Sequence, residues 1–125
     1  MDTTTQAHTE AMRADLSVLV KELLTELGPT AVQAMTGIKD RTAPSRWARP
    51  DGPTTPRDIT QQQLRLGYRV WVMMRDAVGP RVAAPWMVGA NPFLKENTPI
   101  TAIRELRAGE VVGAAQAFSD GMFAA

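Results

Sequence analysis

Few side chains in this sequence of 125 residues could do catalytic chemistry. The chain has no cysteine, and its one histidine, His8, lies in the polar opening segment MDTTTQAHTE. Two carboxylate pairs, Glu22 with Glu26 and Asp15 with Glu22, have spacings that acid–base catalysis could use. Both pairs are expected on the exposed side of a helix, where solvated carboxylates are ordinary, and no group of side chains has metal-ligand spacing. We therefore predict that the protein is not an enzyme and binds no metal or cofactor.

Positive charge is concentrated in one segment, although the whole chain has a formal net charge of only +1. Residues 39–57 contain five basic and two acidic residues, so the local balance is +3. A segment of this kind suits the neutralisation of phosphate groups. An ordinary solvated helix face would have a similar composition, and the charge pattern alone does not separate the two.

The elements that must position these residues are all predicted to be helices. The segment ADLSVLVKELLTELG has apolar residues at the i, i+3, i+4, i+7 spacing of one helix face. We expect this stripe to be buried: Leu16, Leu19, Val20, Leu23, Leu24 and Leu27. Gly28 is expected to end the helix by taking the left-handed conformation.

Two short helices follow, in the order that is typical of a helix-turn-helix. The first, PTAVQAMT, ends at Gly37, and Asp40 is expected to cap the second, over about residues 41–49. Pro44 lies in the first turn of this second helix or just past it. Such a helix enters the major groove with its N-terminal residues. The predicted DNA-binding residues are Lys39, Arg41, Thr42, Ser45, Arg46 and Arg49, whereas Trp47 is predicted to point into the core.

A loop rich in proline and glycine leads to a long helix that is predicted to end at Gly79. Thr60 and Gln63 match a capping box at its start. Apolar residues cover most of its circumference, so we expect it to be buried on more than one side. Core packing is therefore the preferred interpretation of Trp71, Met73 and Met74 over a ligand site.

The last third is predicted to be a string of short helices. Candidates are residues 80–87, a turn started by Asn91 and Pro92, a helix that Thr98 and Pro99 start and Gly109 ends, and VVGAAQAF, followed by SDGMFAA as a tail. No segment shows the period-two alternation of a strand. The sequence predicts an all-α fold, in which an N-terminal helix-turn-helix bundle is followed by a C-terminal cluster of short helices that share the long central helix.

Two aromatic residues in the last third have two possible roles. Trp86 and Phe93 lie among prolines and glycines, where a small domain cannot bury every aromatic. They are either anchors of a partner-binding surface or a small core beneath a loop.

No apolar run approaches the roughly 18 residues of a membrane span. We expect a cytoplasmic protein with no membrane contact, which also fits the absence of cysteine.

The order of these motifs resembles the Xre/MbcA/ParS-type antitoxins, which are partners of RES-domain toxins. The resemblance covers about residues 16–125 and includes LGPTAVQAMTGIKDRTAPSRWARP as the helix-turn-helix. In the C-terminal half the matching residues are Trp86, Met87, Asn91, Leu94, Pro99, Ile103, Arg104, Gly109, Gly121, Met122 and Phe123.

The resemblance implies that different regions of the chain have different functions. A flexible tail (1–10) precedes a helix-turn-helix region (11–59) that binds operator DNA and represses its own operon. A connecting helix (60–79) leads to a toxin-binding region (80–125), which covers the active-site cleft of a toxin that consumes NAD or transfers ADP-ribose from it. Such antitoxins form homodimers or hetero-oligomers with toxin. The expected toxin-binding residues are Trp86, Asn91, Phe93, Leu94, Arg104, Gly121, Met122 and Phe123, with residues 120–125 entering or rimming the cleft.

Two alternative functions stay open from the sequence. One is a stand-alone helix-turn-helix transcriptional regulator of phage or prophage origin that has no toxin partner. The other is a protein-binding module whose helix-turn-helix is vestigial. A neighbouring gene for a RES-domain protein would separate the antitoxin from the first alternative, and binding to DNA near its own promoter would separate the two alternatives from each other.

Overall fold

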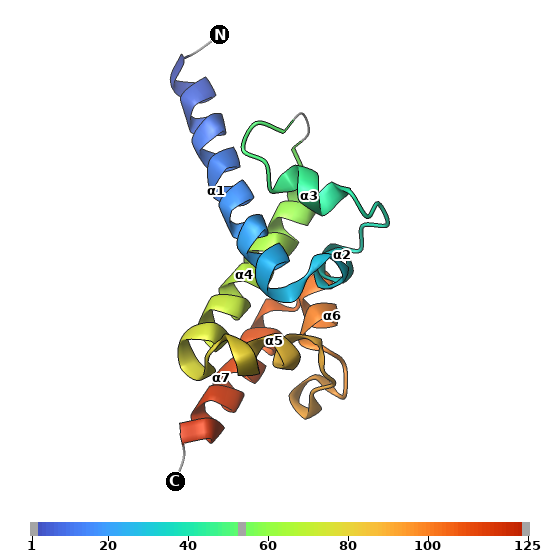
Figure 1. Cartoon of the computed structure of the whole chain (residues 1–125). Coiled ribbons are helices and arrows are strands. Elements are labelled where there is room, and N and C mark those ends of the chain that lie inside the picture. Colours follow the sequence, from blue (N-terminus) through green and yellow to red (C-terminus); the bar gives the residue numbers. More distant parts are fainter. Residues whose placement is uncertain (1–2, 53–54, 124–125) are drawn as a thin grey trace.

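The computed structural model of the chain describes residues 3–52 and 55–123, with side chains for residues 15–52 and 55–121 (Figure 1). These ranges contain helices and no strand, so the predicted all-α fold is confirmed. The helices are α1 (Thr3–Leu27), α2 (Pro29–Thr36), α3 (Ala43–Trp47), α4 (Asp58–Val78), α5 (Pro80–Val88), the 3-10 helix η1 (Pro92–Leu94), α6 (Pro99–Arg104) and α7 (Ala108–Phe123). None of these described helices is both long and apolar enough to cross a membrane.

Helix α4 is the centre of the molecule. It packs against α1 and α2 on one side of the chain and against α5, α6 and α7 on the other. Leu64, Val70, Trp71 and Met74 on α4 are completely buried, as the apolar circumference of this helix predicted. Met73 is partly buried and packs against the same core.

The N-terminal and C-terminal halves share one hydrophobic core. A single cluster of buried residues runs from Leu16 on α1 to Ala115 on α7. Helix α2 packs against α6, and α4 packs against α7. The predicted regions 11–59 and 80–125 therefore bury apolar surface against each other.

The predicted stripe of α1 is confirmed, since Leu16, Leu19, Val20 and Leu23 are buried and Leu24 and Leu27 pack partly against the core. The ends of the helix differ from the prediction. Its backbone is helical from Thr3, where we expected a tail over residues 1–10, because extension of a formed helix adds a hydrogen bond for each residue. Gly28 has the expected positive φ of 88°, but its ψ of 163° is extended rather than left-handed helical.

Close contact between α2 and α4 depends on Gly67. A Cβ atom built at this position would overlap Sδ of Met35 and lie 2.8 Å from its Cε. Met35 is completely buried, so its side chain fills the space that the glycine leaves open. This contact holds the C-terminal end of α2 against the central helix α4.

The predicted capping box at the start of α4 is wrong. The helix begins at Asp58, so Thr60 and Gln63 lie inside it and both are buried. Gln63 does not reach back along its own helix, because its Nε2 donates to the carbonyl oxygen of Arg104 at 2.7 Å. The carboxylate of Asp58 in the first turn suits the positive end of the helix dipole instead.

The caps of the C-terminal short helices are confirmed, but their ends differ from the prediction. Asn91 accepts a hydrogen bond from Phe93 N at 2.9 Å, and Thr98 accepts one from Thr101 N at 3.0 Å. Helix α6 ends at Arg104, well before Gly109, because Leu106 takes a left-handed φ of 56°. Gly109 lies instead in the first turn of α7, and this helix continues to Phe123 through most of the predicted tail.

Candidate functional site

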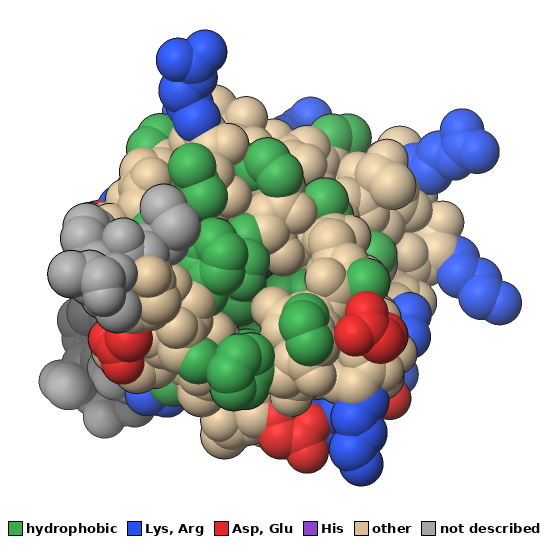
Figure 2. All heavy atoms as spheres, turned by 90° about the horizontal axis from the view of Figure 1, so that it is seen from below, with side chains coloured by type: hydrophobic (Ala, Val, Ile, Leu, Met, Phe, Trp, Pro, Cys, Tyr) green, Lys and Arg blue, Asp and Glu red, His purple; other side chains and the backbone are tan. Residues whose placement is uncertain are grey.

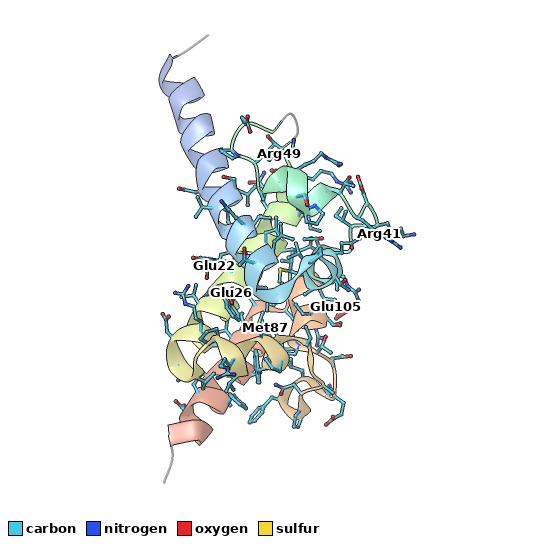
Figure 3. The ribbon with its side chains drawn as sticks, in the orientation of Figure 1. Glu22, Glu26, Arg41, Arg49, Met87 and Glu105 are labelled. Carbon is cyan, nitrogen blue, oxygen red and sulfur yellow. The ribbon has the colours of Figure 1, made fainter. Side chains whose placement is uncertain are left out.

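The connection between α2 and α3 presents the predicted basic residues. Helix α2 ends at Gly37, whose φ of 69° and ψ of 10° are left-handed as expected. Residues 37–42 then lead to α3, a longer connection than the three to four residues of a usual helix-turn-helix. Lys39 and Arg41 are exposed on it, and Figure 3 shows Arg41 at its outer edge.

Asp40 organises this connection through hydrogen bonds. Its Oδ1 accepts from the backbone N of Thr42 at 2.9 Å and from Thr42 Oγ1 at 2.7 Å. Its Oδ2 accepts from Nη2 of Arg46 at 2.9 Å, and Nη1 of Arg46 donates to Thr42 Oγ1. Asp40 therefore braces the start of α3 from two residues before the N-cap Thr42 rather than as the cap itself.

The predicted DNA-binding residues fall into two groups. Five of them are exposed: Lys39, Arg41, Thr42, Ser45 and Arg49. Arg46 is half-buried and bonded to Asp40 and Thr42, so its guanidinium shapes the connection and is less free to meet a phosphate. Trp47 is buried with 8% of its surface exposed, as predicted. Helix α3 has five residues rather than the nine that residues 41–49 would give, and Pro44 lies in its first turn.

The hydrogen bonds from Thr42 and Arg46 lower the pKa of Asp40 to about 2 from its ordinary value of 3.8. The deprotonated form thus stabilises the fold above about pH 4, and this contribution is lost as the pH falls through 2. We expect the difference in melting temperature between the parent and Asp40→Asn to shrink as the pH falls from 4 to 2. A carboxyl titration midpoint near 3.8 in an NMR experiment would contradict the bonding of Asp40.

The second candidate surface is the loop of residues 91–97, which carries η1. Asn91 closes this loop, because its backbone N donates to Asn97 O at 3.0 Å and its carbonyl accepts from Leu94 N and Glu96 N, each at 2.9 Å. Asn91 and Leu94 are buried, so both act as scaffold rather than as surface contacts. Phe93 between them is 70% exposed.

Trp86 on α5 is partly buried and packs against the core. Its ring packs against that of Phe118 on α7, with centroids 6.1 Å apart and planes tilted by 49°. Its Nε1 is buried and has no hydrogen-bond partner within the described part of the chain. Phe118 was not predicted as part of this surface, although it lies seven residues after the buried Val111 on the same helix face.

Arg104, which was predicted to contact the toxin, lies on α6 and is exposed. Its side chain crosses the end of α2, with Cδ 3.5 Å from the position that a Cβ of Gly37 would take. The physical reason is the packing of α6 against α2, which the sequence pattern did not reveal. Gly121 is exposed near the end of α7, and the side chains of Met122 and Phe123 lie outside the described residues.

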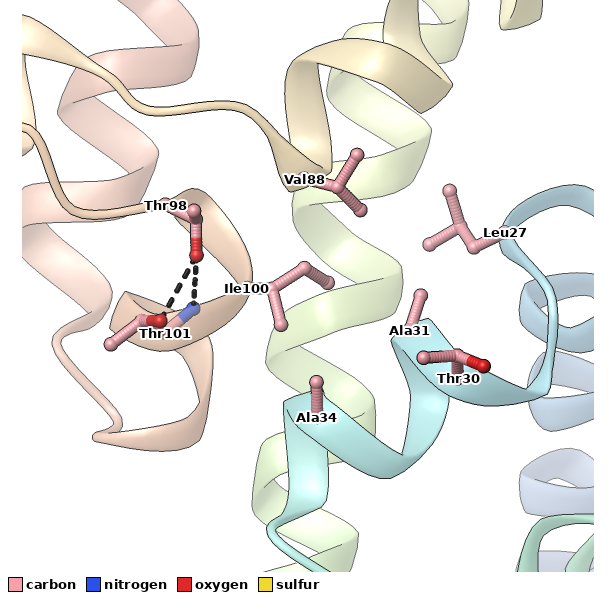
Figure 4. Close-up of a pocket in the computed structure, with 8 residues that line it drawn as sticks. All are labelled: Leu27, Thr30, Ala31, Ala34, Val88, Thr98, Ile100 and Thr101. Atoms are coloured by element: carbon pink, nitrogen blue, oxygen red, sulfur yellow. Dashed lines mark hydrogen bonds between the residues drawn. The ribbon is translucent and has the colours of Figure 1, made fainter. Parts of the chain in front are cut away.

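A pocket of about 360 Å³ joins the two halves of the chain, and the sequence analysis missed it (Figure 4). Its walls come from the end of α1, from α2, from the end of α5 and from the start of α6: Leu27, Thr30, Ala31, Ala34, Val88, Thr98, Ile100 and Thr101. The lining is apolar apart from threonine hydroxyls, and Thr98 Oγ1 is already bonded to Thr101. The pocket therefore suits an uncharged apolar group and offers no acid–base chemistry.

Of the carboxylates considered for catalysis, Glu22 has a structural role. Oε2 of Glu22 accepts from Trp71 Nε1 at 2.8 Å and from Arg75 Nη1 at 2.7 Å, which ties α1 to α4. Glu22 is thus partly buried, not on the solvated face that we expected, whereas Glu26 is exposed (Figure 3). Among the described residues, no three His, Asp or Glu side chains are grouped to hold a metal ion.

Two surfaces of different chemistry thus lie on one shared hydrophobic core. The basic α2–α3 connection and the loop before α6 lie on either side of α6 in Figure 1. Seen from below, the molecule shows apolar side chains across its surface, with lysine and arginine side chains projecting at the edges (Figure 2). Comparison of the chain with models of protein families, with curated proteins and with solved structures gave no match.

Proposed function

We propose that this protein is the antitoxin of a type II toxin–antitoxin system, which binds a RES-domain toxin, covers its active site and represses its own operon. The observation that carries the proposal is the exposure of Phe93, at 70%, on a loop that Asn91 holds in place. The resemblance in the order of the C-terminal motifs points to the class of partner. Occlusion of a partner's active site requires no catalytic residues on this chain.

The loop of Phe93 has the properties of a binding anchor. Large aromatic side chains contribute much of the energy of protein interfaces when a partner buries them. The backbone bonds around Asn91 hold the loop before any partner arrives, so binding would cost little ordering entropy. Val88, which is 52% exposed, adds apolar surface shortly before the loop.

The α2–α3 connection supports the DNA-binding part of the proposal. Lys39, Arg41 and Arg49 are exposed and make no ion pair within the residues that the structure describes. Free cations of this kind can replace the counterions of a phosphate backbone. Arg46 and Asp40 would then position the connection rather than contact the phosphates.

Recovery of partners from the native host tests the proposal directly. A tagged chain is expected to copurify with a RES-domain protein in a fixed ratio, as identified by mass spectrometry. Recovery of DNA near its own promoter without any protein partner would instead support a stand-alone regulator. If the tagged chain recovers neither, both the antitoxin and the repressor assignments are wrong.

Removal of residues 121–125 should abolish neutralisation of the toxin without unfolding the antitoxin. Among the residues of α7 whose side chains the structure describes, the buried ones are Val111, Ala114 and Ala115, and these precede the deletion. Cell survival during toxin expression gives the first readout, and circular dichroism of the purified truncated chain gives the second. Full protection by the truncated chain would show that the C-terminal residues do not block the toxin.

A further inference from the structure

We propose that Arg104 on α6 belongs to the same polyanion-binding surface as Lys39 and Arg41. The C-terminal half of the chain would then contact the phosphate backbone of a nucleic acid directly, beside the α2–α3 connection. This inference rests on the DNA-binding part of the proposed function and extends it to a residue outside the helix-turn-helix region.

The first support is the position of the Arg104 side chain. Its Cδ and Cγ lie 3.5 and 3.9 Å from the place where a Cβ of Gly37 would be, so its aliphatic part runs across the end of α2. Lys39 follows Gly37 by two residues, and its Cα is therefore at most about 7.6 Å from the Cα of Gly37. Arg104 is exposed, so its guanidinium is accessible to a ligand on this side of the molecule.

The second support is the fixed backbone beneath Arg104. Its carbonyl oxygen accepts a hydrogen bond from Gln63 Nε2 at 2.7 Å, and Gln63 is only 5% exposed. The preceding residue, Ile103, is completely buried where α6 packs against α2 and α4. The Cα of Arg104 therefore keeps its place relative to the α2–α3 connection.

The third support is the pairing of nearby charges. Asp40 is hydrogen-bonded to Arg46 at 2.9 Å, and Glu105 forms an ion pair with Arg107 at 3.1 Å. Lys39, Arg41 and Arg104 form no ion pair among the described residues. The neighbouring carboxylates are thus already engaged, which leaves three free positive charges on two packed segments. Such a surface is complementary to closely spaced phosphates.

The salt dependence of duplex binding tests the inference. The probe is a random-sequence DNA duplex of about 25 base pairs, titrated between roughly 50 and 200 mM salt, the range over which phosphate contacts change affinity strongly. The logarithm of the association constant falls linearly with the logarithm of the salt concentration, and Arg104→Gln is expected to make this slope less steep by about 0.9. A change of this size corresponds to the loss of one phosphate contact. Arg41→Gln should have the same effect. The melting temperature should not change, because the Arg104 side chain is exposed and unpaired in the described structure.

Arg81→Gln is the matched control. Arg81 is also exposed and without an ion pair among the described residues. It follows the C-terminal end of α4, whereas Gln63 holds Arg104 near the N-terminal end, so the two arginines are separated by about 20 Å along this helix. We expect Arg81→Gln to keep the slope of the parent.

The possible outcomes separate this inference from the proposed function. If Arg104→Gln binds like Arg81→Gln while Arg41→Gln loses slope, Arg104 is outside the surface and the inference is overturned. If Arg104→Gln weakens capture of the protein partner and leaves duplex binding unchanged, Arg104 belongs to a protein interface, and the inference also fails. The parent could also bind the random duplex with a salt dependence that Arg104→Gln reduces, yet show no preference for DNA from its own promoter. The inference would then be correct and operon repression would be wrong. If the parent binds no duplex, both the inference and operon repression are wrong, and toxin binding is decided by copurification.

Discussion

Replacement of Trp71 with alanine is expected to lower the free energy of unfolding by about 3–5 kcal/mol, the usual cost of truncating a buried aromatic. Trp71 is completely buried at the centre of α4. Its Nε1 also donates to Glu22 Oε2 at 2.8 Å, which links α4 to α1. Truncation would leave a cavity in the core and would also remove the hydrogen bond to Glu22. Denaturant unfolding followed by circular dichroism measures the loss, which is a large share of the stability of a domain of this size.

Two further variants divide this effect into its parts. Trp71→Phe keeps most of the ring but removes the hydrogen bond, and Arg75 still pairs with Glu22 at 2.7 Å, so we expect a loss of only about 1–2 kcal/mol. Ile59→Ala is the control on the same helix, because Ile59 is 53% exposed and its truncation should cost less than about 0.5 kcal/mol. Equal losses for Trp71→Ala and Ile59→Ala would refute the central position of Trp71 in the core.

Replacement of Phe93 with alanine should weaken toxin binding by about 2 kcal/mol, or roughly 30-fold in Kd, the size of an interface hot spot. The reason is that Phe93 exposes 70% of its surface on a loop whose backbone is already held. The same exposure means that the free protein should lose less than about 0.5 kcal/mol of stability. Calorimetric titration of the proposed partner, a purified RES-domain protein, measures the first effect, and thermal unfolding measures the second.

Val18→Ala is the control for this prediction. Val18 lies on α1 and is 67% exposed, which nearly matches Phe93, but it is on an element outside the proposed toxin-binding surface. We expect toxin binding by this variant to equal that of the parent. If Phe93→Ala also binds like the parent, the loop of residues 91–97 is not the anchor, and toxin binding would have to depend on another surface.

Local patterns in the sequence were sufficient for most of the helices. The apolar stripe from Leu16 to Leu27 predicted α1, because one buried face of a helix requires that spacing. Asn91 and Thr98 predicted the starts of η1 and α6, because their side chains accept backbone N–H groups only two and three residues away. The exposure of Lys39 and Arg41 and the burial of Trp47 were also predictable from charge and hydrophobicity.

The sequence by itself thus determined the all-α class, the central apolar helix α4 and the basic character of residues 39–57, since each depends on neighbours within a few positions. Only the tertiary structure decided which side chains meet across the chain. It shows that Gln63 donates to the carbonyl of Arg104 instead of capping its own helix, and that Glu22 accepts from Trp71 instead of lying on a solvated face. It also places the Arg104 side chain against Gly37 at the end of α2. The partners in the first two of these contacts are 41 and 49 residues apart, and Gly37 and Arg104 are separated by a still longer length of chain. Such contacts depend on how the helices pack around α4, and local periodicity and capping patterns carry no information about that packing.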